Sequence, residues 1–243
     1  HAFGAGSPEA RAAIRGADRE IGLLLERLRQ LNMADRTNII VVSDHGFGQE
    51  TFGVNVTDAL VQAGLKSGPD SDDVVIASSG QAMALHVRDR DVTRIASIIR
   101  FLQRQPWTGV LFTAGRPGEA APIAGREPGT FALELAHLGQ AERGPDIVLT
   151  FPWDSSANAF GVAGTNHAAA QTSGPISGAD AGHGALSPWT IRNTFMAWGV
   201  DFKRGVTVNA PSSNAGIAPT LLALMNLERD IDMSVFDGRV LDE

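Results

Sequence analysis

Apolar residues along this chain recur at helical spacing in some segments and form short continuous runs in others, a pattern that predicts a mixed α/β fold. Near the start, Ser7-Pro8-Glu9 is typical of a helix N-terminus, because serine caps, proline fits the first turn and a carboxylate suits the positive end. We therefore expect one amphipathic helix over residues 8–32. The β-branched run that follows predicts a buried parallel strand over residues 37–43.

Similar patterns predict further elements downstream. Helices are expected where a cap or a first-turn proline accompanies an apolar stripe, over residues 55–63, 91–104 and 218–227. Strands are expected in the short apolar runs, over residues 74–76, 83–87, 108–113, 146–151 and 194–198. Residues 131–138 fit either a strand or a short helix. Residues 155–184 are rich in small and polar residues, so we expect a long loop that is functional or mobile.

The most informative candidate site follows the predicted strand over residues 37–43. Asp44 and His45 lie at its carboxyl end, where open α/β sheets bind ligands, and both residue types suit zinc or manganese. Neighbouring residues of a regular strand point to opposite faces, so both can hold one metal only if the backbone leaves strand geometry, which Gly46 permits. The competing interpretation is that Asp44 caps a loop and His45 is exposed.

Two further histidines have surroundings that suit a site. His183 lies between Gly182 and Gly184, which allow a tight turn, although a surface-loop histidine is the competing interpretation. His1 precedes the predicted helix, and a terminal histidine can also be a tag remnant or a frayed end. We interpret His86 as a residue on a sheet face, His137 as a surface residue and His167 as a loop residue.

Composition narrows the function classes. The 243 residues suit one large α/β domain, or one domain with an insertion. The net charge of −7 argues against a nucleic-acid polymer or an anionic membrane as the main partner. The absence of cysteine excludes disulfides and thiolate metal sites, and no stretch approaches the ~20 apolar residues of a membrane span. No nucleotide-binding glycine loop and no Gly-x-Ser-x-Gly elbow is present.

An ordered set of motifs covers the chain from its first residue almost to its last. The motifs are His1-x-Phe3-Gly4-x-Gly6-Ser7-Pro8-Glu9, Asp18-x-x-Ile21-Gly22-x-Leu24-Leu25-x-x-Leu28, Thr37-Asn38-Ile39-Ile40-Val41-Val42-Ser43-Asp44-His45-Gly46, Gly182-His183-Gly184, Gly199-Val200-Asp201-Phe202-Lys203, Ala218-Pro219-Thr220-Leu221-Leu222 and Asp237-Gly238-Arg239-Val240-Leu241. This set resembles the type I phosphodiesterase/nucleotide pyrophosphatase branch of the alkaline phosphatase superfamily.

The resemblance implies an alkaline-phosphatase-like α/β/α sandwich with a site for two divalent metal ions, zinc or alternatively manganese. It assigns Asp44 and His45 to one ion, and His1 and His183 to the other. We expect residues 1–52 and 145–243 to form the metal-binding core and residues 53–144 to form a smaller inserted α+β subdomain.

The resemblance also implies that part of the machinery lies upstream of His1. In the family, the Thr or Ser nucleophile and two further Asp ligands precede the motif matched by His1. We therefore expect a partial fold: the C-terminal portion of the enzyme, with the N-terminal part of the same enzyme as its partner. Since catalytic zinc normally has three protein ligands, two per ion imply weak occupancy and an inactive isolated chain.

The expected reaction is metal-dependent hydrolysis of phosphodiester or nucleotide pyrophosphate bonds in a small-molecule phosphoester. Two alternatives stay open: a phosphonate or sulfate ester hydrolase or phosphomutase on the same scaffold, and a non-catalytic metal-binding module. The compartment is left open, with the resemblance favouring an extracytoplasmic or periplasmic one.

Overall fold

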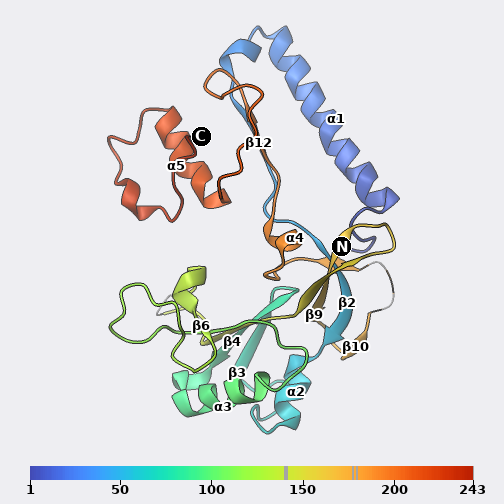
Figure 1. Cartoon of the computed structure of the whole chain (residues 1–243), viewed down its shortest axis with the longest axis vertical. Coiled ribbons are helices and arrows are strands. Elements are labelled where there is room, and N and C mark those ends of the chain that lie inside the picture. The colour runs from blue at the N-terminus through green and yellow to red at the C-terminus, as the bar shows by residue number, and fades with distance from the viewer. Residues whose placement is uncertain (140–141, 177, 179, 243) are drawn as a thin grey trace. The chain divides into compact units, whose positions relative to one another are not determined.

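The computed structural model describes residues 1–139, 142–176, 178 and 180–242 (Figure 1). The chain divides into two compact units, and each is described by itself. The first unit contains His1–Ala13 and His45–Arg192, and the second contains Ile14–Asp44 and Asn193–Glu243.

The first unit contains two five-stranded sheets. One sheet has the order β10-β2-β9-β8, with β11 also paired to β2. Its strands are β2 Gly48–Val54, β8 Trp153–Ala157, β9 Ala163–Ala169, β10 Gly174–Pro175 and β11 Ala181–Gly182. The other sheet has the order β3-β4-β7-β5-β6. Its strands are β3 Val74–Ser78, β4 Ala82–Val87, β5 Leu111–Thr113, β6 Phe131–Ala132 and β7 Ile147–Thr150.

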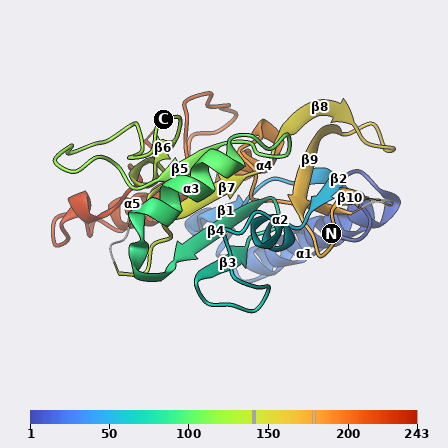
Figure 2. The same cartoon turned by 90° about the horizontal axis from the view of Figure 1, so that it is seen from below.

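The main hydrophobic core lies between the second of these sheets and two helices, α2 Val56–Gln62 and α3 Val92–Leu102. Leu60 of α2 and Ile98 of α3 are fully buried and belong to one cluster with the strand residue Leu85. Figure 2, viewed from below, shows α3 running across this sheet. The core stabilises the first unit by removing these side chains from water.

The helices of the first unit begin where the capping signals predict. The side chain of Asn55 accepts a hydrogen bond from the main chain of Asp58, and Asp91 caps α3 in the same way. Ser7 Oγ accepts from the amide of Ala10, as expected for the cap of α1 Pro8–Gln30. The remaining short helices are α4 Pro188–Ile191 and the 3₁₀ turns η2 Arg88–Arg90 and η3 Leu133–Ala136. The undecided segment 131–138 therefore contains both a short strand and a helical turn.

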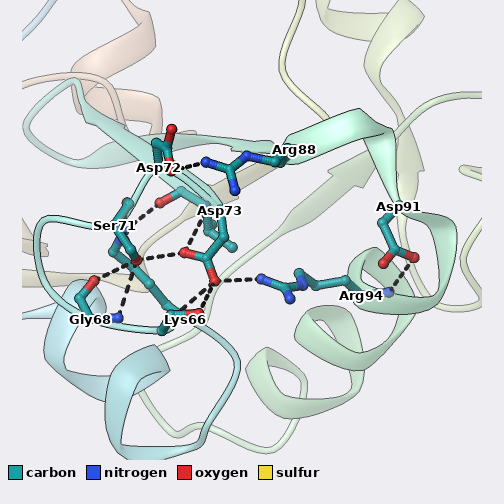
Figure 3. A network of polar contacts seen from close by, with 10 residues as sticks. Lys66, Gly68, Ser71, Asp72, Asp73, Arg88, Asp91 and Arg94 are labelled. Carbon is teal, nitrogen blue, oxygen red and sulfur yellow. Dashed lines mark hydrogen bonds and ion pairs between the residues drawn. The ribbon is translucent and has the colours of Figure 1, made fainter.

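A satisfied polar network ties the loop before β3 to helix α3 (Figure 3). Asp73 accepts hydrogen bonds from Ser71 Oγ at 2.5 Å and Ser67 Oγ at 2.7 Å, and pairs with Arg94 at 2.5 Å. These hydrogen bonds, led by that from Ser71, hold the pKa of Asp73 far below its usual range. Lys66 Nζ donates to the carbonyl oxygen of Val74 at 2.7 Å. The network is structural, since its donors are paired with acceptors of the loop before β3 and so fix that loop to α3.

The second unit contains most of α1, the strands β1 Ile39–Val42 and β12 Phe195–Trp198, and helix α5 Ile217–Leu224. Its 3₁₀ turns are η1 Ala34–Arg36, η4 Asn214–Gly216 and η5 Met233–Val235. The prediction of a buried parallel strand over residues 37–43 was wrong in two respects. β1 pairs antiparallel with β12, and Val42 is 40% exposed. A β-branched run favours a strand, but it carries no information about the partner or about what covers the strand.

The expectation of a long loop over residues 155–184 was also wrong in part, because strands interrupt it. The described part carries the end of β8 and all of β9, β10 and β11, while residues 177 and 179 lie outside the described residues. β9, β10 and β11 pair with β2, which is parallel to β9 and antiparallel to β10 and β11, and β8 pairs antiparallel with β9. Their small residues give no alternating apolar signal, because the pairing rather than side-chain burial stabilises them.

Two observations concern domain organisation and membranes. β7, outside the predicted insert over residues 53–144, pairs with β4 and β5, which lie inside it. The division into a metal-binding core (1–52 and 145–243) and an insert stays a prediction, and the two compact units have other boundaries. Among the helices of the described residues, none combines the length and the apolar character required to cross a bilayer.

Candidate functional site

Three histidine rings that are far apart in the sequence gather in the first unit. The ring centroids of His45 and His183 lie 3.7 Å apart with their planes at 23°. The ring of His1 lies 5.5 Å from that of His183. Phe47 flanks the group, with its ring centroid 4.9 Å from that of His1. The structure therefore brings together three of the four side chains that sequence analysis predicted as metal ligands.

The pairing of β2 and β11 explains this convergence. In their antiparallel register Gly182 is opposite Gly48, so His183 follows β11 at the same end at which β2 begins. His45 precedes β2 by three residues and reaches that end of the pair. The amide of Ala181 donates to the carbonyl oxygen of His1 at 2.9 Å, which places the first residue beside β11.

Glycine is required at two positions next to these histidines. A Cβ at Gly46 would lie 1.9 Å from the carbonyl oxygen of Trp189, so only glycine allows this close approach to α4. Gly184 has φ +102°, which strains any other residue. His45 Nδ1 lies 2.8 Å from the carbonyl oxygen of Gly46. In the neutral ring, Nδ1 therefore carries the proton and Nε2 carries the lone pair.

A layer of buried polar side chains lies next to the histidine group, and sequence analysis missed all of them. Gln81 is fully buried, and its Nε2 donates to the carbonyl oxygen of Gly48 at 3.2 Å and to Glu50 Oε1 at 3.4 Å. Burial raises the pKa of Glu50. Asn166 is 1% exposed, and neither its Nδ2 nor its Oδ1 has a hydrogen-bond partner among the described residues. No sequence signal could have found them, because the burial of these amides depends on which strands meet.

Asp44, the fourth predicted ligand, belongs to the second unit. Its carbonyl oxygen accepts a hydrogen bond from Asn214 Nδ2 at 3.0 Å, and that of Ser43 accepts one from Asn193 Nδ2 at 2.7 Å. These bonds fix the backbone at the end of β1. The role of Asp44 as a metal ligand stays a prediction.

The donor types of the histidine group fit zinc, because neutral imidazole nitrogens are common ligands of that ion. The arrangement is less complete. His45 and His183 lie face to face, and the described residues contain no group of three or more His, Cys, Asp or Glu side chains that could hold a metal ion. Imidazoles are thus gathered in one place, and the assignment of an ion to them is a proposal.

The remaining histidines differ in their surroundings. His86 lies on β4 and His137 is exposed, as expected from the sequence. His167 was predicted in a mobile loop, which was wrong, because it lies on β9 with its ring 5.2 Å from that of Phe52. Burial lowers the pKa of His167, and the nearby Asp154 opposes this shift.

Comparison with known proteins shows the family to which this chain is similar. The type I phosphodiesterase/nucleotide pyrophosphatase family matches residues 1–157, a range that includes His1 and His45 but not His183. Human ectonucleotide pyrophosphatase/phosphodiesterase family member 7 is 44% identical over 46 residues, which are 19% of this chain and 10% of that protein.

A solved structure supports the fold. Human ectonucleotide pyrophosphatase/phosphodiesterase 5 superposes with a TM-score of 0.59 at 18% identity, over 93% of this chain and 50% of that one. The likeness confirms the predicted alkaline-phosphatase-like α/β fold class, and this chain spans about half the length of that relative. Since the family match covers well over half of the 243 residues, the chain belongs to the type I phosphodiesterase/nucleotide pyrophosphatase family.

Proposed function

We propose that this chain is part of an enzyme that hydrolyses phosphodiester or nucleotide pyrophosphate bonds of small-molecule substrates with the help of bound divalent metal ions. The observation that carries the proposal is the stacking of His183 on His45 at 3.7 Å. His183 lies outside the range matched by the family, yet it reaches the histidine that follows β1.

The proposed roles follow the predicted ligand sets. Asp44 and His45 would hold one ion, and His1 and His183 would hold the other, with zinc favoured over manganese by the imidazole-rich donors. A bound ion at this position supplies Lewis-acid stabilisation of charge on a phosphoryl oxygen. The residues of this chain bind and orient: the Nδ1 contact of His45 with the Gly46 carbonyl fixes which ring nitrogen can face a ligand.

We further propose that the nucleophile and the remaining carboxylate ligands come from a segment that precedes His1 in the intact enzyme. Support comes from the solved relative, of which this chain covers 50%. Under this proposal the chain alone has few ligands per ion and little activity. The intact enzyme hydrolyses the ester.

The test uses the protein made from the complete coding sequence and an aryl phosphodiester as substrate. We expect chelation to abolish hydrolysis and added zinc to restore it. His183→Ala should lower the rate by more than about 100-fold, because loss of a ligand exceeds the roughly 10–100-fold effect of losing a residue that supports one. His137→Ala is the matched control, since His137 is exposed. Hydrolysis that ignores both chelation and His183→Ala would overturn the proposal.

The same preparation separates this reaction from its rivals. Phosphodiester, pyrophosphate, phosphonate and sulfate esters with one aryl leaving group are compared at equal concentration. The proposal predicts the highest kcat/KM for a diester or a pyrophosphate. A higher value for the sulfate or phosphonate ester would move the chain to the alternative hydrolase class.

A further inference from the structure

The segment that carries His183 is held from outside. Its flanking glycines leave the backbone free to move, so the position of the ring depends on contacts with other segments. The main-chain N–H of Gln81 donates to the carbonyl oxygen of His183 at 3.0 Å. A Cβ at Gly184 would lie 2.5 Å from the carbonyl oxygen of Ser79, so the turn before β4 packs directly on this segment.

The side chain of Gln81 extends these contacts to the other histidine-bearing strand. Its amide donates to the carbonyl oxygen of Gly48, and Gly48 pairs with Gly182 in the β2–β11 register. It also reaches Glu50 Oε1, the atom that a Cβ at Gly182 would approach to 2.1 Å. One residue thus contacts β2, which follows His45, and the main chain of His183.

Burial makes these contacts selective. Gln81 is 0% exposed, so a shift of the His183 segment away from it would leave the buried main-chain N–H of Gln81 without a partner, and loss of its side-chain bonds to β2 would release the turn that carries this N–H. The arrangement in which the two imidazoles are adjacent is therefore the one in which the hydrogen bonds of Gln81 are made.

We propose that Gln81 is a positioning residue that holds the His183 segment against β2 and so keeps the imidazole of His183 beside that of His45. Gln81 acts through the main chain of both segments. It belongs to the turn before β4, a strand of the other sheet, so a turn within the predicted insert over residues 53–144 helps to build the site. The consequence for metal binding rests on the proposed function.

The test compares Gln81→Met with Gln105→Met. Methionine keeps the length and volume of glutamine but has no amide, and Gln105 is a half-buried glutamine that donates to the carbonyl oxygen of Phe101. The first measurement is the nuclear Overhauser effect between the ring protons of His45 and His183 in histidine-labelled protein without metal. The second is the zinc dissociation constant of the intact enzyme, obtained by competition with a chelator.

We expect Gln81→Met to remove the ring-to-ring effect and to raise the zinc dissociation constant about 10–100-fold. Gln105→Met should change neither. If the wild-type protein binds no zinc but Gln81→Met still removes the ring-to-ring effect, the positioning role stands and the metal-dependent function fails. If Gln81→Met leaves both measurements unchanged, the positioning role is overturned.

A second variant covers the case in which Gln81→Met does not fold. Gln81→Asn keeps an amide but shortens the side chain by one methylene, so it loses reach to Gly48 and Glu50 with little change in polarity. It should weaken the ring-to-ring effect in a folded protein. An unchanged effect in this variant would also overturn the proposal.

Discussion

The two compact units differ in what covers their apolar residues. In the part of the chain that the structure describes, the buried Val, Leu, Ile, Met, Phe and Ala side chains lie in the first unit, whereas the second unit buries Pro219 and Thr220 of α5. The second unit instead has large exposed apolar side chains on α1, on the β1–β12 ribbon and in the loop after it: Ile14, Leu23, Leu24, Met196, Trp198 and Val200. Its two-stranded ribbon is marginal by itself in water. Local signals can therefore form helices and strands without forming a core.

The second unit also contains a groove of about 560 Å³ between its own elements. Leu25 and Leu28 of α1 and Trp198 of β12 contribute apolar walls, and Arg29 and Lys203 add positive charge. In the first unit, α2 and α3 cover the second sheet, and their apolar side chains pack in one buried cluster. The first unit is therefore stabilised by its own hydrophobic core, whereas the second has exposed apolar elements that suit further packing.

Truncation of leucine to alanine should show the largest difference in stability between the two units. Leu85→Ala in the first unit, where the side chain is fully buried, should cost about 2–5 kcal/mol through lost burial and the cavity left behind. Leu24→Ala in the second unit, where the residue is 51% exposed, should change the free energy of unfolding by less than about 0.5 kcal/mol. Urea unfolding measures both. Equal losses would mean that α1 is as well packed as the core.

Charged contacts should give a smaller difference in the same direction. Asp73→Asn in the first unit weakens the contacts of this carboxylate with Ser67, Ser71 and Arg94 and should cost about 2 kcal/mol at pH 7. Asp201→Asn, which alters an exposed contact with Asn38, should stay within about 0.5 kcal/mol.

The pH dependence sharpens this second comparison. Folding lowers the pKa of Asp73 below its unfolded value of about 3.9. Its contribution is therefore complete above that value and is lost as the pH falls toward the folded pKa. The gap between wild type and Asp73→Asn should stay constant above about pH 5 and should shrink as the pH falls below about 4, near the unfolded pKa. A gap independent of pH would contradict the role of the ionised carboxylate.

Much of the fold could be predicted from local chemistry. The caps Ser7, Asn55 and Asp91 begin helices as expected, because a side-chain oxygen before an apolar stripe satisfies free amides. The partner of β1 could not be predicted, since its β-branched residues suit any pairing. The strand β9 was missed because small residues leave no periodic signal.

The candidate site divides in the same way. His1, His45 and His183 could be predicted because their motifs stand in a recognisable order. Gln81 and Asn166 could not, because a buried amide has no sequence pattern of its own and its place depends on which strands meet.

The most direct test of the central claim is anomalous X-ray scattering at the zinc edge from crystals of the intact enzyme grown with zinc. The account predicts an anomalous peak about 2.0–2.1 Å from an imidazole nitrogen of His183, with His1 as a further ligand of the same ion. It predicts a second peak whose ligands include Asp44 and His45. Zinc bound elsewhere, with the rings of His1, His45 and His183 free of metal at saturating zinc, would contradict it.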